Sequence, residues 1–471
     1  MIAIIVVFIG ALFCLYLGIK KQESFAVPIA LTTLAIAIGI TSVQLIGKEP
    51  WALELSLRSG GMMLFDFSAQ LFSLILLVGL FLVLLGFKPL KTIGADLLGL
   101  LMFSLCGGML LTGFTHLVMM FLGIEVLSIP LYVLAGAQKT NKSSNEAAIK
   151  YFLMGAFSTA ILLMGCAFIY GGTGTLELEG LNRATYMQGH MKLATPLVFG
   201  GVLLIFIGFL FKVAAVPFHF WTPDVYEGSP TRATVFMATV VKIAAFAGLI
   251  RLFAIGFGEL KDPVWLNTLA IASALSIVIG NATATIQKNA KRLLAYSGIA
   301  QAGYMLIAFV GNNYSTDIWN LWVYAGAYIF ASVIVFTIIG IVEENGNSSD
   351  LESFRGLSIH NKFLAFALVV AMFSMAGIPL TMGFVGKYGI LTAAFGVKPW
   401  LVVIALVGSA IGIGVYFSFF KQAILSRTDK PLNKLKVSLS QNIALVISVA
   451  AILIIGILPL LLTNIKDFFI N

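Results

Sequence analysis

The chain has 471 residues, of which 60% are hydrophobic and only 10% are charged, whereas a typical soluble domain carries about 25% charged residues. The mean hydropathy is +1.02. A soluble fold cannot bury this much apolar surface, so the composition predicts an all-α polytopic membrane protein. About fourteen spans of about 20 residues would use about 280 residues, which leaves short loops and excludes a soluble catalytic domain.

No redox, metal or nucleotide site is recognisable in the sequence. Cys14, Cys106 and Cys166 lie singly in apolar runs, which argues against a disulfide framework, an iron–sulfur centre or a zinc site. Neither GxGxxG nor a GxxxxGK phosphate loop is present. The net charge is +9, and loop lysines and arginines in a membrane protein report its orientation, not binding of nucleic acid. We therefore expect no cofactor and no metal ion in this chain.

Fourteen spans follow from the hydropathy. In chain order they are 2–19, 25–46, 64–87, 93–112, 114–135, 147–170, 195–218, 231–254, 264–286, 293–310, 317–342, 361–395, 399–421 and 439–463. The first is interpreted as a span, because it lacks the basic leader and cleavage site of a signal peptide. The twelfth is too long for one crossing and contains Gly377 and Pro379, and the seventh ends at Pro217. Both spans are predicted to be broken inside the protein or beside a hydrated cavity.

Most lysines and arginines lie in the loops after odd-numbered spans. The positive-inside rule places these loops in the cytoplasm and both termini on the outer, periplasmic side.

An internal repeat has an offset of about five spans. Gly208-Phe-Leu-Phe-Lys212 recurs as Gly383-Phe-Val-Gly-Lys387, 175 positions later, and Tyr151 and Gly123-Ile124 have counterparts in Tyr324 and Gly298-Ile299. Units five spans apart enter the membrane from opposite sides, as in the inverted repeats of secondary transporters.

Four ionisable residues stand out within the apolar spans: Glu125, Lys212, Lys242 and Lys387. A charge at the bilayer centre costs about 2.5–3.5 kcal/mol on insertion scales and often marks an ion route. Desolvation disfavours an ammonium and a nearby carboxylate favours it, so a Glu–Lys pair of variable distance has a switchable proton affinity. Glu125 with Lys212 would be such a pair, followed by Lys242 and then Lys387. The alternatives are snorkelling, above all for Lys242, and an ion pair that only fixes helix packing.

Other polar residues have weaker claims. His219 follows the break in span seven and could relay protons or pack at the loop end, and His116 is a weaker candidate. His190 and His360 lie in loops and receive no role. Acidic residues near span ends are interpreted as helix caps or interface contacts; these are Asp66, Asp96, Asp224 and Glu227. The acidic stretch 343–355 is either a solvated cytoplasmic loop or a contact for a soluble partner.

Residues 211–231, FKVAAVPFHFWTPDVYEGSPT, resemble the signature of the antiporter-like subunits of complex I, the NADH–quinone oxidoreductase. The DVYEGSPT wording, VKIAAF at 241–246 and KYFLMGAF at 150–157 are more similar to the subunit N branch than to its sisters L and M. The resemblance covers most of the chain from about residue 93. It implies fourteen helices with two inverted five-helix repeats and broken helices seven and twelve. The implied segments are 1–92 (three N-terminal helices), 93–260 (first repeat), 261–422 (second repeat) and 423–471 (last helix).

The resemblance also implies proton transfer by the pair Glu125 and Lys212, by the central Lys242 and by Lys387 of the second repeat. Span ten has no acidic residue that mirrors Glu125, so the two halves should not work identically. FMN, iron–sulfur clusters and quinone would bind to partner subunits, and the membrane neighbours would be subunits M and K. The chain alone would then have no dehydrogenase activity.

The sequence thus predicts a proton-translocating subunit of complex I in a bacterial inner membrane. Three alternatives stay open. The chain could belong to a multi-subunit sodium/proton antiporter or a membrane-bound hydrogenase, it could be a stand-alone solute carrier, or it could be a structural spacer. A sodium site would need clustered carboxylates and carbonyl oxygens, and the spans offer one mid-membrane carboxylate, Glu125.

Overall fold

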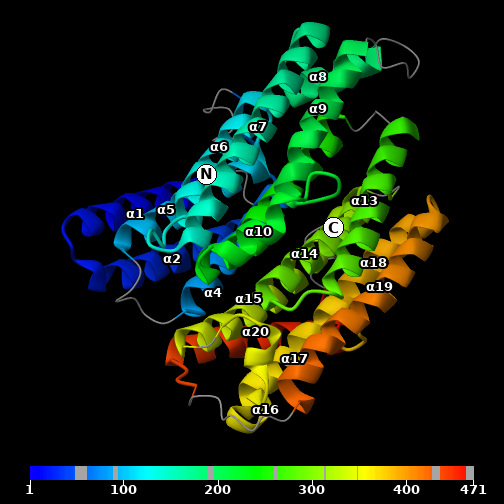
Figure 1. Ribbon diagram of the computed structural model, residues 1–471. Coiled ribbons are helices and arrows are strands. Elements are labelled where there is room, and N and C mark those ends of the chain that lie inside the picture. The colour runs from blue at the N-terminus through cyan, green and yellow to red at the C-terminus, as the bar shows by residue number, and fades with distance from the viewer. Residues whose placement is uncertain are drawn as a thin grey trace. The chain divides into compact units, whose positions relative to one another are not determined.

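The computed structural model describes residues 1–47, 61–87, 94–187, 196–257, 263–311, 314–346, 348–426 and 435–462. Within these ranges every regular element is a helix, and extended backbone pairs only as isolated bridges (Figure 1). The predicted all-α class is therefore confirmed.

Twelve helical stretches of the described part are long and apolar enough to cross a membrane. They are formed by α1 (Ile2–Ile19), α2 (Ala26–Gly47), α4 (Phe67–Leu85), α5 (Ala95–Gly113), α6 (Leu117–Ala135), α7 (Lys142–Thr173), α9 (Pro196–Val213), α11 (Thr231–Phe236) with α12 (Lys242–Arg251), α13 (Pro263–Ala284), α15 (Tyr314–Glu344), α19 (Pro399–Phe420) and α20 (Leu439–Ile457). The two other predicted spans correspond to α14 (Ala290–Ile307) and to α17 (Lys362–Ala376) with α18 (Met382–Phe395). All fourteen predicted spans thus have a helical counterpart.

Shorter elements connect or interrupt these spans. They are α8 (Leu178–Met187), α10 (Trp221–Gly228), α16 (Leu357–His360), the 3₁₀ turns η1 (Glu23–Phe25) and η4 (Leu351–Phe354), and the π-helical segments η2 (Met237–Val241), η3 (Leu252–Gly256) and η5 (Lys421–Leu425). The segment η2 joins α11 to α12, so the eighth span is a continuous helix with one wide turn in its middle.

Both predicted breaks are present. The helix α9 ends at Val213, five residues before the predicted end of its span, and Ala214 has a positive φ of 60°. The chain then turns through residues 214–220 before α10 begins. In the twelfth span α17 ends at Ala376, Gly377 has a φ of +81°, and α18 begins at Met382. Glycine adopts positive φ without steric cost, which explains the stop at Gly377.

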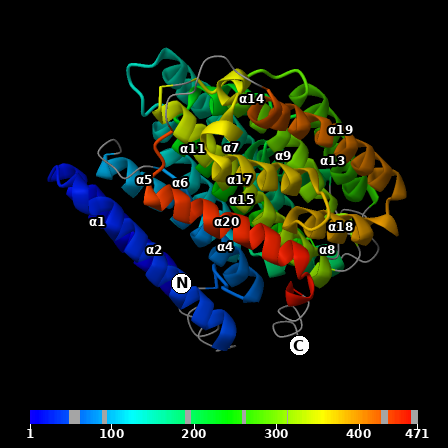
Figure 2. The same cartoon turned by 90° about the horizontal axis from the view of Figure 1, so that it is seen from below.

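The chain forms two compact units. One comprises residues 1–81, 90–214 and 240–268, and the other comprises 82–89, 215–239 and 269–471. The break in the seventh span therefore falls at a boundary between the units. In the first unit α1 packs beside α2 and α5, and α7 runs along α9 (Figures 1 and 2). In the second unit α15 is the central helix, with α17, α18 and α20 packed around it. Of the residues in its most apolar 18-residue stretch, 94% are buried.

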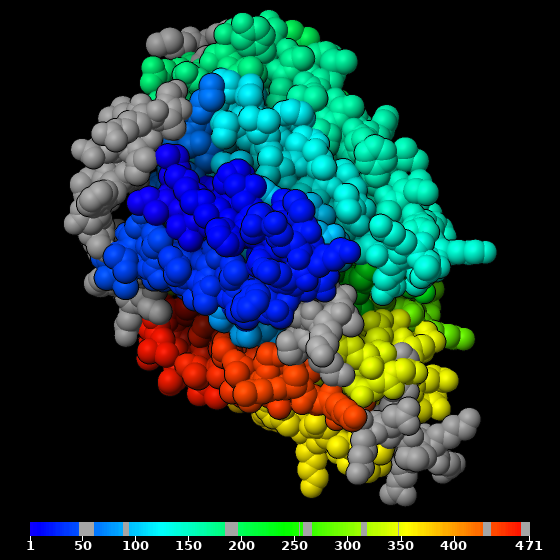
Figure 3. Space-filling model, turned by 90° about the vertical axis from the view of Figure 1, so that its left-hand side faces the viewer, coloured from blue at the N-terminus to red at the C-terminus, as the bar shows by residue number. Residues whose placement is uncertain are grey.

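The outward face of α1 is apolar and fits contact with lipid. Phe8, Leu12, Phe13 and Tyr16 are exposed along this helix, which is dark blue in Figure 3. Its other face is buried, with Val7, Ala11 and Cys14 fully covered.

The order of helices supports the repeat. The longest helix of each five-helix series is the third, α7 with 32 residues and α15 with 31 residues, and the break falls in the fourth span of each. Five spans, an odd number, separate equivalent helices, which is the spacing expected of inverted repeats. The predicted segment boundaries stay a prediction, and those at 92/93 and 260/261, together with residues 463–471, lie outside the described residues.

Candidate functional site

Lys212 is buried at the end of α9. Its ammonium donates a hydrogen bond to Ser128 Oγ at 2.7 Å, and Ser128 is fully buried in α6. Ser128 in turn donates to the Ile124 carbonyl of its own helix. Only 5% of Lys212 is exposed, so this lysine does not snorkel to an interface.

Glu125 lies on α6 one turn before Ser128 and is half-buried. Its negative charge favours the charged form of the Lys212 ammonium. Among the described residues no direct ion pair joins them, and Ser128 is the direct contact instead. The predicted pairing of Glu125 with Lys212 stays a prediction, and the direct contact is a hydroxyl group that the sequence analysis did not single out.

Aromatic rings surround this lysine. The Lys212 ammonium lies 6.0 Å from the centroid of the Tyr132 ring and 5.6 Å from that of Phe211, distances at which a cation is attracted to the ring face. Tyr151 packs edge-on against Tyr132 at 5.1 Å between centroids. A Cβ atom at Gly155 would clash with the Tyr132 hydroxyl, so glycine is needed there for Tyr132 to keep its place.

Lys242 is the first residue of α12 and follows the π-helical segment η2 directly. It is 1% exposed, and every residue of α12 is buried. Wide π turns are rare in proteins, and those that do occur often lie at functional sites. The burial of Lys242 is incompatible with snorkelling within this unit.

Lys387 is held by the end of another helix segment. The last carbonyls of a helix have no partner in their own helix. The N–H groups of Gly377 and Ile378 satisfy the carbonyls of Phe373 and Ser374. Of the last four carbonyls of α17, this leaves those of Met375 and Ala376. They accept hydrogen bonds from the Lys387 ammonium at 2.9 and 3.1 Å.

A helix C-terminus carries partial negative charge, so these two carbonyls stabilise a buried cation without a carboxylate. The Lys387 ammonium also lies 4.4 Å from the centroid of the Tyr304 ring. A Cβ atom at Gly377 would lie 2.8 Å from Lys387 Cδ, so the break keeps open the space that this side chain uses.

A buried polar cluster adjoins Lys387. Gln301 on α14 contacts the Met375 carbonyl, Tyr416 on α19 and Tyr324 on α15. Tyr416 also shares a hydrogen bond with Ser297. The sequence analysis missed Gln301 and Tyr416, because a single polar residue in an apolar span gives no signal of its partners.

His219 belongs to the segment between α9 and α10 and is buried beside the ring of Phe220. Its Nδ1 atom has no hydrogen-bond partner among the described residues. Its role as a relay stays a prediction. His116 caps α6, since its ring accepts a hydrogen bond from the Val118 N–H.

Asp66 acts as a helix cap, as predicted for acidic residues near span ends. Asp66 accepts hydrogen bonds from Ser68 and from the Ala69 N–H at the start of α4. It also pairs with the buried Arg251 at 2.7 Å. Asp96 lies in the first turn of α5, where a negative charge is favourable.

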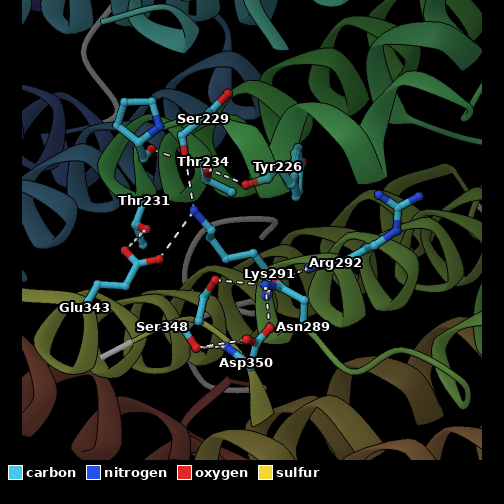
Figure 4. Close-up of polar contacts among 12 residues, drawn as sticks. Tyr226, Ser229, Thr231, Thr234, Asn289, Lys291, Arg292, Glu343, Ser348 and Asp350 are labelled. Carbon is cyan, nitrogen blue, oxygen red and sulfur yellow. Dashed lines mark hydrogen bonds and ion pairs between the residues drawn. The ribbon is translucent and has the colours of Figure 1, made fainter. Parts of the chain in front are cut away.

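A polar cluster joins three loops of the second unit. The Lys291 ammonium lies between the Ser229 carbonyl at 3.2 Å and Glu343 at 3.4 Å, as Figure 4 shows. Arg292 pairs with Asp224 at 2.8 Å and with Glu227 at 2.9 Å. The loops after spans seven, nine and eleven therefore lie at the same end of this unit, as the predicted topology requires.

The same cluster bears on the acidic stretch 343–355. Glu343 pairs with Lys291 and Glu344 pairs with Arg232, so the start of this stretch is packed against its own unit and is not simply a solvated loop.

Nowhere in the described residues are three His, Cys, Asp or Glu side chains grouped so that they could hold a metal ion.

Paired five-helix series, two broken spans and a buried lysine beside each break define a class of membrane proteins built like secondary transporters. Comparison with known proteins narrows this class. Residues 114–412 match the family model described as NADH:quinone oxidoreductase/Mrp antiporter, TM. The chain belongs to this family, which confirms the resemblance inferred from the motifs.

Individual relatives agree. The chain is 44% identical over 324 residues to NADH-quinone oxidoreductase subunit N of Cytophaga hutchinsonii, covering 68% of this chain and 69% of the relative. It is 35% identical over 436 residues to the protein of the same name from Desulforamulus reducens, covering 91% and 88%.

Solved structures show the same fold. A chain of respiratory complex I from Thermus thermophilus with bound aureothin is 32% identical, with a TM-score of 0.80 and 97% of each chain covered. A chain of the Mrp complex from Dietzia has a TM-score of 0.83 at 17% identity, with 99% of this chain and 96% of that chain covered. The second likeness is one of fold alone.

Proposed function

We propose that this chain is a proton-translocating membrane subunit of a bacterial NADH–quinone oxidoreductase, complex I. The family, the subunit N relatives and the chain of Thermus thermophilus complex I support the assignment to that enzyme. The Mrp complex shares the fold at low identity, so it carries no argument for sodium transport.

One observation carries the proton-transfer role. Lys212 and Lys387 are buried inside their units beside a helix break, and their direct contacts are neutral oxygens: the Ser128 hydroxyl for Lys212 and two helix-end carbonyls for Lys387. An ammonium removed from water is stabilised only by such neighbours. A small change in the distance to those oxygens, or to Glu125, therefore changes proton affinity. Structural ion pairs lack this property because a direct charged contact keeps both partners ionised.

The proposed route uses Glu125 and Lys212 in the first unit, Lys242 in the buried middle of the eighth span, and Lys387 in the second unit. His219 would be a further relay. The packing-only alternative predicts instead that these side chains can be replaced without loss of transport.

The chain would do no redox chemistry. NADH oxidation would take place on FMN and iron–sulfur clusters in partner subunits, and quinone would bind there too. Isolated from those partners, the chain would have no NADH–quinone reductase activity. Its membrane neighbours would be the antiporter-like subunit M and the small subunit K. The protein would lie in the inner membrane with both termini on the outer side.

The test uses the whole complex, isolated through a tag on this chain and reconstituted in lipid vesicles. Lys212→Ala and Lys387→Ala should each lower NADH-driven proton uptake at least about tenfold, the effect of losing about 1.4 kcal/mol. NADH–quinone turnover should fall with it if pumping and electron transfer are tightly coupled. Lys142→Ala, which removes an exposed lysine at the start of α7, is the matched control and should pump normally.

Assembly is measured in the same preparation. Flavin and iron–sulfur absorbance of the eluate test the assignment to complex I, and elution with antiporter or hydrogenase subunits would contradict it. An assembled Lys212→Ala complex with normal proton uptake would remove Lys212 from the route.

A further inference from the structure

Gln301 is a buried amide near Lys387 that forms hydrogen bonds to three other helices. It lies on α14, is 2% exposed, and uses both ends of its amide. Its Nε2 group donates to the Met375 carbonyl at 3.0 Å and to the Tyr416 hydroxyl at 2.8 Å, and its Oε1 atom accepts from the Tyr324 hydroxyl. Three helices other than its own thus meet at this one side chain.

The Met375 carbonyl is shared. The Lys387 ammonium donates to this oxygen at 2.9 Å and the Gln301 amide donates to it at 3.0 Å. A carbonyl oxygen has two lone pairs, so both are occupied. Each donor draws electron density from the oxygen, so each of the two hydrogen bonds is weaker than it would be alone. The Gln301 amide therefore reduces the hold of Met375 on the Lys387 ammonium.

The orientation of the amide is fixed by its surroundings. If the amide were turned over, its oxygen would face the Met375 oxygen, which is an acceptor only. The Nε2 group must therefore point at Met375, and Oε1 then faces Tyr324, whose hydroxyl has to donate. Tyr416, anchored by Ser297, accepts the second amide hydrogen.

We propose that Gln301 is a positioning residue for proton transfer at Lys387: by sharing the Met375 carbonyl, its locked amide keeps the Lys387 ammonium loosely enough held to release its proton. This inference rests on the proposed function and deepens it. It gives the second unit a neutral residue in place of the carboxylate of the first unit.

Few other groups act on Lys387. The helices packed against α18 are α14, α15, α17, α19 and α20. Their buried titratable side chains near the break are tyrosines, namely Tyr304, Tyr324, Tyr328 and Tyr416. Their charged residues stand in first or last turns: Lys291, Arg292, Glu343, Glu344, Lys362 and, outside the described side chains, Asp317. A change at Gln301 therefore acts without a competing carboxylate beside Lys387 in the described part of these helices.

The test is the pH profile of NADH-driven proton uptake by the reconstituted complex. In Gln301→Leu the Met375 carbonyl is left to Lys387 alone, so proton release slows. Uptake at neutral pH should fall about twofold, because sharing changes the strength of one hydrogen bond to a charged group by only about 10–30%. The pH profile should move to higher pH, where release from the more tightly held ammonium is restored.

A second variant guards against failure to assemble. Gln301→Glu keeps the size of the side chain and adds an ionisable carboxyl group. Its ionised form favours the Lys387 ammonium, so the alkaline displacement should exceed that of Gln301→Leu. Tyr324→Phe removes the donor that locks the amide and should give a smaller displacement in the same direction.

The matched control is Gln441→Leu. Gln441 is also a fully buried amide of the second unit, but it serves the capping box of α20 with Ser438 and contacts Glu344. Its loss should lower the melting temperature of the complex and leave the pH profile unmoved. A structural role of Gln301 alone would give this same pattern.

The outcomes distinguish the role of Gln301 from the proton route through Lys387. Assembled Gln301→Leu and Gln301→Glu complexes with the wild-type pH profile would overturn the role of Gln301, even if Lys387→Ala abolishes uptake as the proposed function requires. Normal uptake by Lys387→Ala would instead overturn the route through Lys387, and the role of Gln301 with it.

Discussion

The two lysines beside the helix breaks are stabilised by different kinds of neighbour. Lys212 is the last but one residue of α9, contacts one hydroxyl group, and has the Glu125 carboxylate nearby. Lys387 lies in the helix that follows a break, α18, and contacts two carbonyls at the end of α17. The repeat aligns these lysines in sequence, yet one stands before its break and the other after it.

The difference shows two ways to keep an ammonium in a membrane. A carboxylate on a neighbouring helix supplies a full charge that can itself gain a proton. The end of a helix supplies partial charges that cannot titrate, so the proton affinity of the lysine then depends on geometry alone. The first unit is thus sensitive to charge and the second to the shape of the break.

Glu125→Gln tests whether the two units differ, because it gives the first unit a neutral amide like Gln301 of the second. Lys212 has no pair of helix-end carbonyls among its described contacts, so the amide should not replace the carboxylate. Proton uptake should fall on the order of tenfold or more, as expected for loss of about 1.4 kcal/mol, and is measured in reconstituted vesicles. Glu146→Gln is the control, since Glu146 is exposed and pairs with Lys150 one turn away. Normal uptake by Glu125→Gln would mean that the two units work alike.

The shape of the second break is tested by Gly377→Ala. Forcing alanine into the left-handed region costs about 1–2 kcal/mol, and the new Cβ would press on Lys387. Uptake should fall about fivefold, the effect of about 1 kcal/mol. Gly174→Ala is a matched control, because Gly174 also has positive φ, +73°, but faces open space. Both variants should lower the melting temperature similarly, and only Gly377→Ala should lose uptake. Equal uptake in the two would show that space at the break does not matter.

The smallest effect is expected for Ser128→Ala. The variant removes the hydroxyl that Lys212 contacts but leaves Glu125 and the rings of Tyr132 and Phe211 in place. Uptake should fall about threefold, the lower end of what one hydrogen bond contributes. Ser104→Ala is the control. It removes a buried hydroxyl of α5 that donates to the Leu127 carbonyl of α6, next to Ser128, and it should leave uptake unchanged. A fall as large as that of Lys212→Ala would make Ser128 an equal partner in transfer.

Hydropathy predicted the spans well because burial in lipid leaves a continuous apolar run. It failed where a helix continues beyond the apolar run: α7 begins at Lys142, five residues before its predicted start, because Asn141 caps it and its first turns are polar. It also placed the end of the seventh span at 218, whereas the helix stops at Val213.

The buried lysines were recognisable from sequence because charge is rare in an apolar run. Their direct partners were not. Ser128 is one of many serines in spans, and the acceptors for Lys387 are backbone carbonyls that no side-chain pattern encodes. Gln301 stands one position away from the residue that aligns with Glu125, so even the repeat did not indicate it. Such contacts depend on how separate helices pack.

The wide turn η2 has a consequence for how the eighth span can change over time. Each residue of a regular helix advances the side-chain direction by about 100°, and a π turn accommodates one residue more than a regular turn. Lys242 comes directly after this extra residue. If this segment closed to a regular helical turn without loss of a residue, Lys242 and the rest of α12 would rotate by about 100° relative to α11. The direction of Lys242 is therefore set by whether this segment keeps its wide turn or closes to a regular one.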